Sequence, residues 1–564
     1  MERTRFTSKS LVPNAYGDAQ MIASAEMKPN TAPDVPSALG KVADYLETPT
    51  AWWIALSLML MGLLLPLLLV EVPPLTDYPN HLARGLFLAF GADDPATSRM
   101  FARNWQIAPN LALDMILPPL LFIMSPLIAG KVLLAIAAIL PATGAIALNQ
   151  ACFQRRSLWA LGVGLVVYNI PFLLGFINFQ LGVGVALWGA AAWIAIGPER
   201  PLVRIATGAV FALVAFFSHL FSFAFFGVLI GCAEAAAIYQ RGFTSSATLT
   251  FAIKRLSAVA GALILPAVLY VVSPLASTGG YVFRNSWVEK IKTLAVPVGG
   301  YAPKQTYIIL AALALILAIL IIKRRLRVAP LVFFALPLLA VVFLLLPTGA
   351  KGVFYIDTRI PVMMGFLLFA ATMPRKSQSL ELGIYLVLTA LFVARITLIS
   401  QNWLSAQSDI QQVRLAMATV TPGSRVLAVD TLSRDAEQEP VRFRVMARSY
   451  PGNYWHYASF AYIDHHAFWA DAFTLYGQQP VVALPPYNPS SNPGGFPIQN
   501  YGLLADPTAT GQTKRPSYLT AWPSKFDYIL VMNADRDKTL ERFLPGKLSF
   551  VSRQGFAVLL KVRR

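Results

Sequence analysis

The stretch AWWIALSLMLMGLLLPLLLVEV, Ala51–Val72, decides the class of fold. About twenty consecutive apolar residues form a helix long enough to cross a hydrocarbon layer about 30 Å thick. Blocks of the same kind recur along the 564-residue chain, which is 56% hydrophobic and only 13% charged. A soluble protein of this size has no core large enough to bury so much apolar surface. The sequence therefore predicts a multi-pass membrane protein that is mostly α-helical.

The chain on either side of this stretch divides at changes of composition. Residues 1–50 are polar and show no apolar period, which predicts a disordered cytoplasmic tail. The apolar run that follows is too long for the core of a signal peptide. Residues 51–400 are expected to form a polytopic transmembrane helical bundle of about eleven spans. The expected spans are 51–72, 131–149, 157–176, 178–197, 203–218, 221–240, 254–274, 306–322, 328–347, 359–374 and 379–399.

Short basic loops predict the orientation of these spans. The motifs QRRS, PER, KRRLR and PRK all fall on one side, and Lys and Arg in short loops mark the cytoplasmic side. The formal net charge of +18 follows from this bias, and no basic stripe with interleaved aromatics predicts a nucleic-acid partner. A glycosylation sequon without Pro is absent from the sequence, which favours a bacterial inner membrane. External loops are then expected at 71–110, 276–305 and 347–358.

The segment LALDMILPPLLFIMSP, Leu111–Pro126, is apolar enough to cross the membrane but contains Asp114 and two adjacent prolines. These residues are better suited to a re-entrant or interfacial helix. A crossing segment would move Arg155 and Arg156 to the outside, which conflicts with the orientation above. We therefore expect residues 111–126 to lie in or on the membrane without spanning it.

From Gln401 the composition changes again. SRVLAVD (Ser424–Asp430) and FDYILVMN (Phe526–Asn533) have the pattern of short buried strands, and Leu548–Val562 has the pattern of a hairpin. Residues 401–564 are expected to form a small extracytoplasmic α/β domain. An odd number of spans places it in the periplasm, opposite the cytoplasmic N-terminus.

The stretch PPLTDYPNHLAR, Pro73–Arg84, follows the first span and contains two candidate site residues. Pro79 suits the first turn of a helix, and Thr76 or Asp77 would cap that helix well. Asp77 is thus either a helix cap or a carboxylate held at the outer surface as a general base. His81, one turn further on, would share its face.

Two further polar residues stand at membrane edges. His219 in FFSHLFSF separates two apolar helices, and it either faces a cavity or partner or is satisfied by a backbone carbonyl. Arg359 in KGVFYIDTRIP either reaches lipid headgroups or clamps a phosphate. Arg284 and Lys351 are candidates for the same phosphate site. The adjacent pair His465 and His466 lacks the spacing of metal ligands, so a divalent metal remains an option without a clear motif.

Several of these motifs resemble those of the GT-C glycosyltransferases, membrane enzymes that use polyprenyl-phosphate sugars as donors. TDYPNHLAR matches the first external loop of that family, with Asp77 in the place of the catalytic acid. ILPPLL (Ile116–Leu121) is similar to a Pro-Pro-Leu element of aminoarabinose and protein mannosyl transferases, and Tyr168–Leu187 and the late external domain also fit the family layout. A second acid of the Asp-x-Asp type is missing, and either Asp114 or the Asp93–Asp94 pair is the candidate to replace it.

The resemblance implies transfer of a sugar to an extracytoplasmic glycan, lipid or protein, with inversion at the anomeric carbon. Asp77 would take the acceptor proton, the cationic residues would hold the donor phosphate, and His81 or His219 would orient the acceptor or contact the phosphate. Membrane lipids are further expected partners. Two alternatives stay open: a transporter or flippase of a lipid-linked saccharide, and a non-catalytic envelope assembly protein with the same fold.

Overall fold

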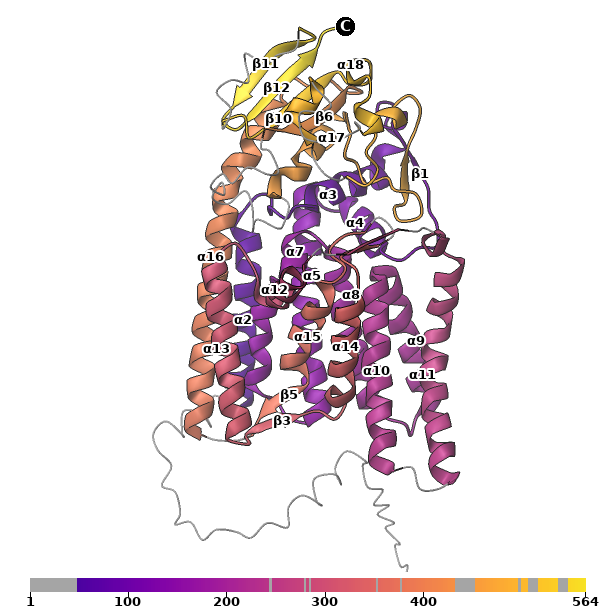
Figure 1. Ribbon diagram of the computed structural model, residues 1–564, viewed down its shortest axis with the longest axis vertical. Helices are drawn as coiled ribbons and strands as arrows, with labels where there is room; N and C mark the ends of the chain where they lie inside the picture. Colours follow the sequence, from indigo (N-terminus) through magenta and orange to yellow (C-terminus); the bar gives the residue numbers. More distant parts are fainter. Residues whose placement is uncertain are drawn as a thin grey trace, which may run out of the picture.

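The computed structural model describes residues 48–242, 246–277, 280–283, 286–350, 353–375, 378–431, 452–495, 499–505, 516–535 and 546–564. The fold has two parts, a helical bundle and a domain that contains the main sheet at one end of the bundle (Figure 1). The predicted tail falls almost entirely outside the described residues, and so do Arg284 and Lys351.

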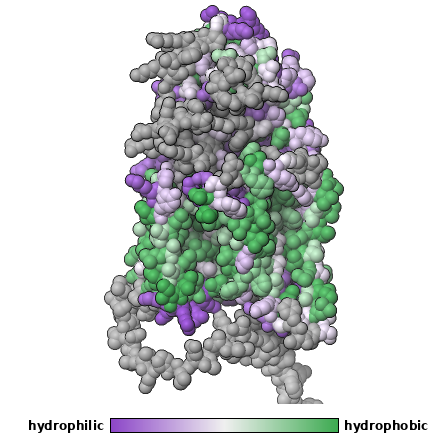
Figure 2. Space-filling model, viewed as in Figure 1, coloured by the Kyte–Doolittle hydropathy of each residue, from purple (hydrophilic) through white to green (hydrophobic). Residues whose placement is uncertain are grey.

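Eight helices among the described residues are long and apolar enough to cross a membrane. They are α2 (Pro49–Leu69), α5 (Pro126–Phe153), α8 (Ile177–Ile196), α9 (Pro201–Ser218), α10 (Leu220–Arg241), α11 (Ser246–Val272), α13 (Pro303–Ile322) and α16 (Gln378–Ala416). Hydrophobic residues gather on the surface of this half of the molecule, and hydrophilic residues lie at both of its ends (Figure 2). This distribution is the one expected of a bundle solvated by lipid.

The eleven predicted spans do not all form long helices. The segment 157–176 is broken into η3 (Leu158–Val163), α6 (Gly164–Val167) and α7 (Ile170–Leu173). Residues 328–347 and 359–374 contain only α14 (Val332–Leu345) and α15 (Arg359–Ala370). A helix of fourteen residues rises about 21 Å, which is less than the thickness of the hydrocarbon layer. Periodicity of apolar residues alone does not reveal such breaks.

Arg395 on α16 compensates for the break in 157–176. Its buried guanidinium donates hydrogen bonds to the carbonyl oxygens of Tyr168, Val298 and Gly299, at 2.5–2.8 Å. Carbonyl groups released at a helix break need such a donor where water is excluded. Asn169 also donates from its Nδ2 to the carbonyl oxygens of Val166 and Val167. Its side-chain oxygen accepts from the backbone N–H of Phe172 at the start of α7. The break therefore brings the next residues, 173–176, to the end of the bundle.

The predicted strands of the C-terminal part are confirmed. β6 (Arg425–Asp430) pairs in parallel with β10 (Tyr528–Met532), and the hairpin of β11 (Leu548–Gln554) and β12 (Ala557–Val562) continues the sheet in antiparallel register. β7 (Phe468–Trp469) and β9 (Gln499–Asn500) pair with β6.

The expected boundary at residue 401 lies inside a helix, because α16 continues without interruption to Ala416. Its last turns contact the hairpin. The side-chain oxygen of Gln412 accepts from the N–H of Phe556, and the Ser552 hydroxyl donates to the carbonyl of Ala416.

The remaining elements are short. The helical ones are α3 (Tyr78–Leu86), η2 (Phe87–Gly91), α4 (Ala112–Leu121), η4 (Pro274–Ser277), α12 (Trp287–Lys292), η5 (Thr293–Val298), η6 (Asn453–Ser459), α17 (Phe460–His465), η7 (Asn488–Ser490), η8 (Tyr501–Leu504), η9 (Ser517–Leu519) and α18 (Trp522–Lys525). Three two-stranded sheets join β1 (Phe101–Arg103) to β8 (Val481–Ala483), β2 (Tyr281–Val282) to β4 (Gly349–Ala350), and β3 (Leu326–Val328) to β5 (Thr372–Pro374).

The pairing of β1 with β8 ties the loop after the first long helix to the C-terminal domain. α4 belongs to the predicted re-entrant segment, and its ten residues rise only about 15 Å. As a helix, this segment is therefore too short to cross the membrane.

Candidate functional site

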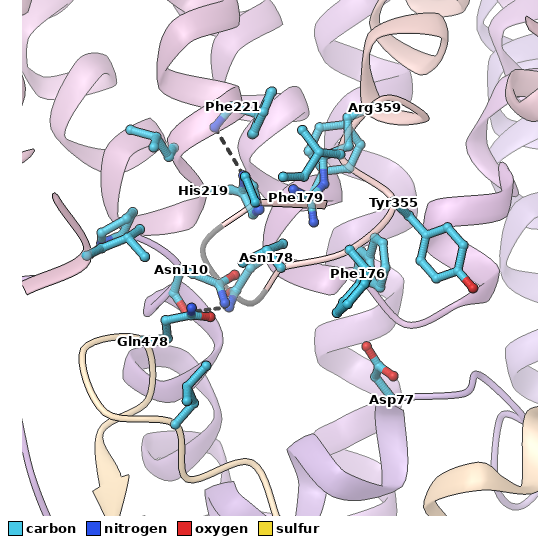
Figure 3. A pocket seen from close by; sticks show the side chains of 18 of the residues that line it. Asp77, Asn110, Phe176, Asn178, Phe179, His219, Phe221, Tyr355, Arg359 and Gln478 are labelled. Atoms are coloured by element: carbon cyan, nitrogen blue, oxygen red, sulfur yellow. Dashed lines mark hydrogen bonds between the residues drawn. The ribbon is translucent and has the colours of Figure 1, made fainter. Parts of the chain in front are cut away.

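A cavity of about 630 Å³ lies where the helical bundle meets the C-terminal domain. Its wall comes from the start of α3, the α7–α8 and α9–α10 junctions, the start of α15 and the loop around 473–479. Four of the predicted site residues line it: Asp77, His81, His219 and Arg359. Figure 3 shows Asp77 and Arg359 directed toward the same space from different elements.

Asp77 stands directly before α3, at the cap position, but it does not cap the helix. Its backbone is helical, with φ −86° and ψ −12°, and its side chain accepts no capping hydrogen bond. The hydroxyl of Thr76 is buried and has no hydrogen-bond partner among the described residues. The interpretation of Asp77 as a helix cap is therefore wrong. Its side chain lines the cavity without a capping hydrogen bond.

The broken segment before α8 fixes the position of Asp77. The backbone N–H of Asp77 donates to the carbonyl of Leu174 at 2.9 Å. Gly175 follows with φ +91°, and a Cβ there would lie 2.8 Å from the Asp77 nitrogen and 2.9 Å from its Cβ. Only glycine combines this conformation with such a close approach. The chain on either side of this contact, at Leu174 and Phe176, lines the cavity.

Burial decides the charge of Asp77. Removal from water raises the pKa of its carboxyl to about 8, and the nearby Arg84 guanidinium opposes the rise. Arg84 is already engaged, because its Nε and Nη2 bind both oxygens of Asp114 at 2.6 and 2.9 Å. Asp114 is buried in this pair and does not line the cavity. The structure therefore does not bring the predicted second carboxylate to Asp77.

His81 lies one turn after Asp77 and lines the same cavity, as the helical spacing predicts. Burial lowers the pKa of its imidazole well below the usual value, with smaller contributions in the same direction from Arg84 and His456. Its Nδ1 is buried without a hydrogen-bond partner among the described residues. A neutral imidazole with a vacant nitrogen can receive or donate one hydrogen bond to a bound molecule.

His219 faces the cavity as expected, but its recorded backbone partner is an N–H group and not a carbonyl. Its Nδ1 accepts the backbone N–H of Phe221 at 3.1 Å, so that it caps the N-terminus of α10. Its ring lies edge-on to Phe179, with ring centroids 5.6 Å apart, and it lines the cavity. With Nδ1 occupied as an acceptor, the neutral ring carries its proton on Nε2. This nitrogen is then a fixed donor.

Arg359 is the first residue of α15, and only 3% of it is exposed. It therefore does not reach out to lipid headgroups. The guanidinium carbon lies 5.3, 5.9 and 5.4 Å from the ring centroids of Phe176, Phe179 and Phe221. Its Nε is buried without a hydrogen-bond partner among the described residues. The carboxylate of Asp357 is a nearby opposite charge. The aromatic faces attract the cation but do not satisfy its Nε–H, so this donor is available to an anion.

The C-terminal domain contributes residues that the sequence did not single out for this cavity. The ring of Phe473 lies 5.3 Å from that of His81 and 4.9 Å from that of His456, and it lines the cavity. Asn80 and His456 meet although 376 positions separate them. No local pattern in the sequence signals such a contact.

No group of three or more His, Cys, Asp or Glu side chains suited to a metal ion occurs among the described residues. Comparisons of the chain with protein-family models, with curated proteins and with solved structures found no significant match. The likeness to GT-C enzymes therefore rests on the short motifs of the sequence.

The contact between Gly175 and Asp77 can be tested with a matched pair of variants. Gly175→Ala adds a methyl group against Asp77 at a positive φ, whereas Gly197→Ala adds one at φ +71° with nothing within 4 Å. Both carry a backbone penalty of about 1–3 kcal/mol for a side chain at positive φ, but only the first displaces Asp77. We expect Gly175→Ala to lower the thermal unfolding midpoint in detergent clearly more than Gly197→Ala. Equal midpoints would contradict the close approach.

Proposed function

We propose that this protein is an integral-membrane inverting glycosyltransferase. It moves a sugar from a polyprenyl-phosphate donor to an extracytoplasmic glycan, lipid or protein. The observation that carries the proposal is a carboxylate and an arginine that share one cavity without neutralising each other. Burial raises the pKa of Asp77 to about 8, so that its carboxylate can accept a proton near neutral pH, and the Nε–H of Arg359 is a buried donor without an acceptor among the described residues.

In the proposed reaction Asp77 removes the proton of the acceptor hydroxyl. The acceptor oxygen forms a bond to the anomeric carbon, while the bond from that carbon to the lipid-phosphate oxygen breaks. The electron pair of this bond leaves with the phosphate, and attack from the opposite side inverts the configuration. The proton ends on the carboxyl of Asp77, so that atoms and charge balance.

Stabilisation of the leaving phosphate falls to Arg359 and His219. A phosphate leaving group gains negative charge as the bond breaks, and donors fixed in advance lower the barrier most. The guanidinium is held by three phenylalanine rings, and the His219 ring is oriented by its bond to Phe221. Arg284 and Lys351 stay candidates for the same role, although both lie outside the described residues.

The walls of the cavity suit a donor with a lipid tail. Beyond the polar residues they are apolar, with contributions from Leu275, Leu346, Val353 and Phe354. A flippase of a lipid-linked saccharide would use the same walls, but it has no special need of a carboxylate fixed at the start of α3 under a sizeable C-terminal domain. This difference is the reason for preferring the enzyme over the transporter or an assembly protein.

We further propose that the eight long helices are joined by three broken or short segments, 157–176, 332–345 and 359–370, to give eleven crossings. The N-terminus then lies in the cytoplasm and the C-terminal domain in the periplasm. Gln554→Cys in the β11–β12 hairpin and Lys323→Cys after α13 place exposed thiols on opposite sides. An impermeant maleimide should label the first in spheroplasts and the second only after lysis. The reverse pattern would overturn the orientation.

The transferase can be tested by mass spectrometry of lipids that co-purify with the protein. Asp77→Asn should retain one polyprenyl-phosphate sugar that wild type consumes, because binding survives and proton removal does not. Arg359→Ala should lose that lipid, since the phosphate loses its guanidinium. Lys304→Ala is the control, because this lysine is an exposed cation outside the cavity lining. Equal amounts of the same lipid on wild type and Asp77→Asn would favour a flippase or an assembly protein.

The rate of transfer should depend on pH through Asp77. Its pKa is raised to about 8 by burial, and only the ionised form accepts a proton. The value of kcat/KM should therefore rise about tenfold per pH unit from pH 6 and level off above pH 8. A profile that is flat between pH 5 and 8 would show that the base has an ordinary carboxyl pKa or is another group.

A further inference from the structure

His456 of the C-terminal domain lies beside the carboxylate of Asp77. It belongs to η6, and its side chain is 1% exposed. Its Nε2 is 3.5 Å from Oδ1 of Asp77, whose own side chain is one-fifth exposed. This separation is slightly longer than a hydrogen bond, and a small rotation of the Asp77 side chain closes it. Such contacts commonly tighten when substrate fills a site.

Asn80 determines which nitrogen of His456 carries the proton. The side-chain oxygen of Asn80 accepts the backbone N–H of Phe473 at 3.1 Å, and its Nδ2 donates to the carbonyl of Asp471 at 2.6 Å. These two backbone groups fix the orientation of the amide. The second hydrogen of Nδ2 is then directed at Nδ1 of His456, 3.1 Å away. Nδ1 is therefore an acceptor, and the proton of the neutral ring sits on Nε2, facing Asp77.

The contact between His456 and Asp77 is not an ion pair at neutral pH. Burial lowers the pKa of His456 to about 3, so that the imidazole is uncharged. The other titratable groups around the two side chains are His81 and Arg84 on α3, Arg359 on α15 and Asp471 of the C-terminal domain. Arg84 is paired with Asp114, His81 is neutral, and burial raises the pKa of Asp471 to about 6.

We propose that His456 is a positioning residue for Asp77, with its Nε2–H donating to Oδ1 of the carboxylate. This inference rests on the proposed transferase function. A donor to the ionised form favours that form and offsets part of the cost of burial. It also leaves Oδ2 as the oxygen that takes the acceptor proton. His456 keeps its own proton throughout, and the proton from the acceptor ends on Asp77.

This arrangement couples the base to the docking of the C-terminal domain. His456, Asp471 and Phe473 all come from that domain, and all three meet the first turn of α3 through Asn80 or Asp77. When the C-terminal domain is docked, the carboxylate of Asp77 has a hydrogen-bond donor that also fixes its orientation. A purely structural histidine would need only the bond to Asn80 and would not present an N–H to the carboxylate.

Two substitutions separate the functions of the two ring nitrogens. His456→Asn reaches the position of Nδ1 and keeps an acceptor for Asn80, but it has no donor near Asp77. His456→Gln is longer and can place an amide N–H near the position of Nε2. The measurement is the pH profile of kcat/KM, together with the unfolding midpoint and the amount of bound donor lipid. Asp77→Asn and wild type are measured alongside.

We expect His456→Asn to shift the acid limb of the profile upward by about one pH unit, which lowers the rate at pH 7 about tenfold. The KM for the donor, the bound lipid and the unfolding midpoint should change little. His456→Gln should keep the limb closer to that of wild type. A limb that does not move in His456→Asn, or that moves equally in both variants, would overturn the positioning role. If Asp77→Asn transfers sugar as well as wild type, the proposed function itself fails.

Discussion

The side-chain amide of Asn80 is the contact on which the site depends. It joins α3, which follows the first long helix, to a segment almost four hundred residues later. Its nitrogen takes part in two hydrogen bonds and its oxygen accepts one. Backbone partners on two sides leave the amide one orientation. The fixed amide orients the ring of His456, whose Nε2 faces the carboxylate of Asp77. These hydrogen bonds at the domain junction therefore hold in place side chains of both parts that lie at the cavity.

The distribution of charge around the cavity follows from the cost of burial. Arg84 and Asp114 neutralise each other with two hydrogen bonds and stay out of the cavity. Arg359, which has Asp357 as a nearby opposite charge, and Asp77, which lies beside the neutral His456, are at different points of its wall. A carboxyl group with a raised pKa and a buried guanidinium in one cavity are groups that functional sites commonly combine. A phosphate and an acceptor hydroxyl would satisfy the two groups.

The cavity is lined in part by chain segments at which the helices of the bundle are interrupted. Where residues 157–176 stop being a continuous helix, Arg395 and Asn169 take over the hydrogen bonding of the backbone. The released chain then passes so close to Asp77 that Gly175 is needed. His219 likewise caps α10 at the junction with α9 and faces the cavity. Irregular backbone at the end of a bundle is tolerated where it lines a cavity, because its polar groups are satisfied there.

The sequence by itself determined the apolar helices, the C-terminal strands and four lining residues: Asp77, His81, His219 and Arg359. These depend on local properties, such as the length of an apolar run or a polar residue at its edge. Only the tertiary structure decided that Asp114 pairs with Arg84, that three expected spans are broken or short, and that His456 meets Asp77. The reason is physical. Helix breaks and charge partners depend on hydrogen bonds between distant residues, and these have no period in the sequence.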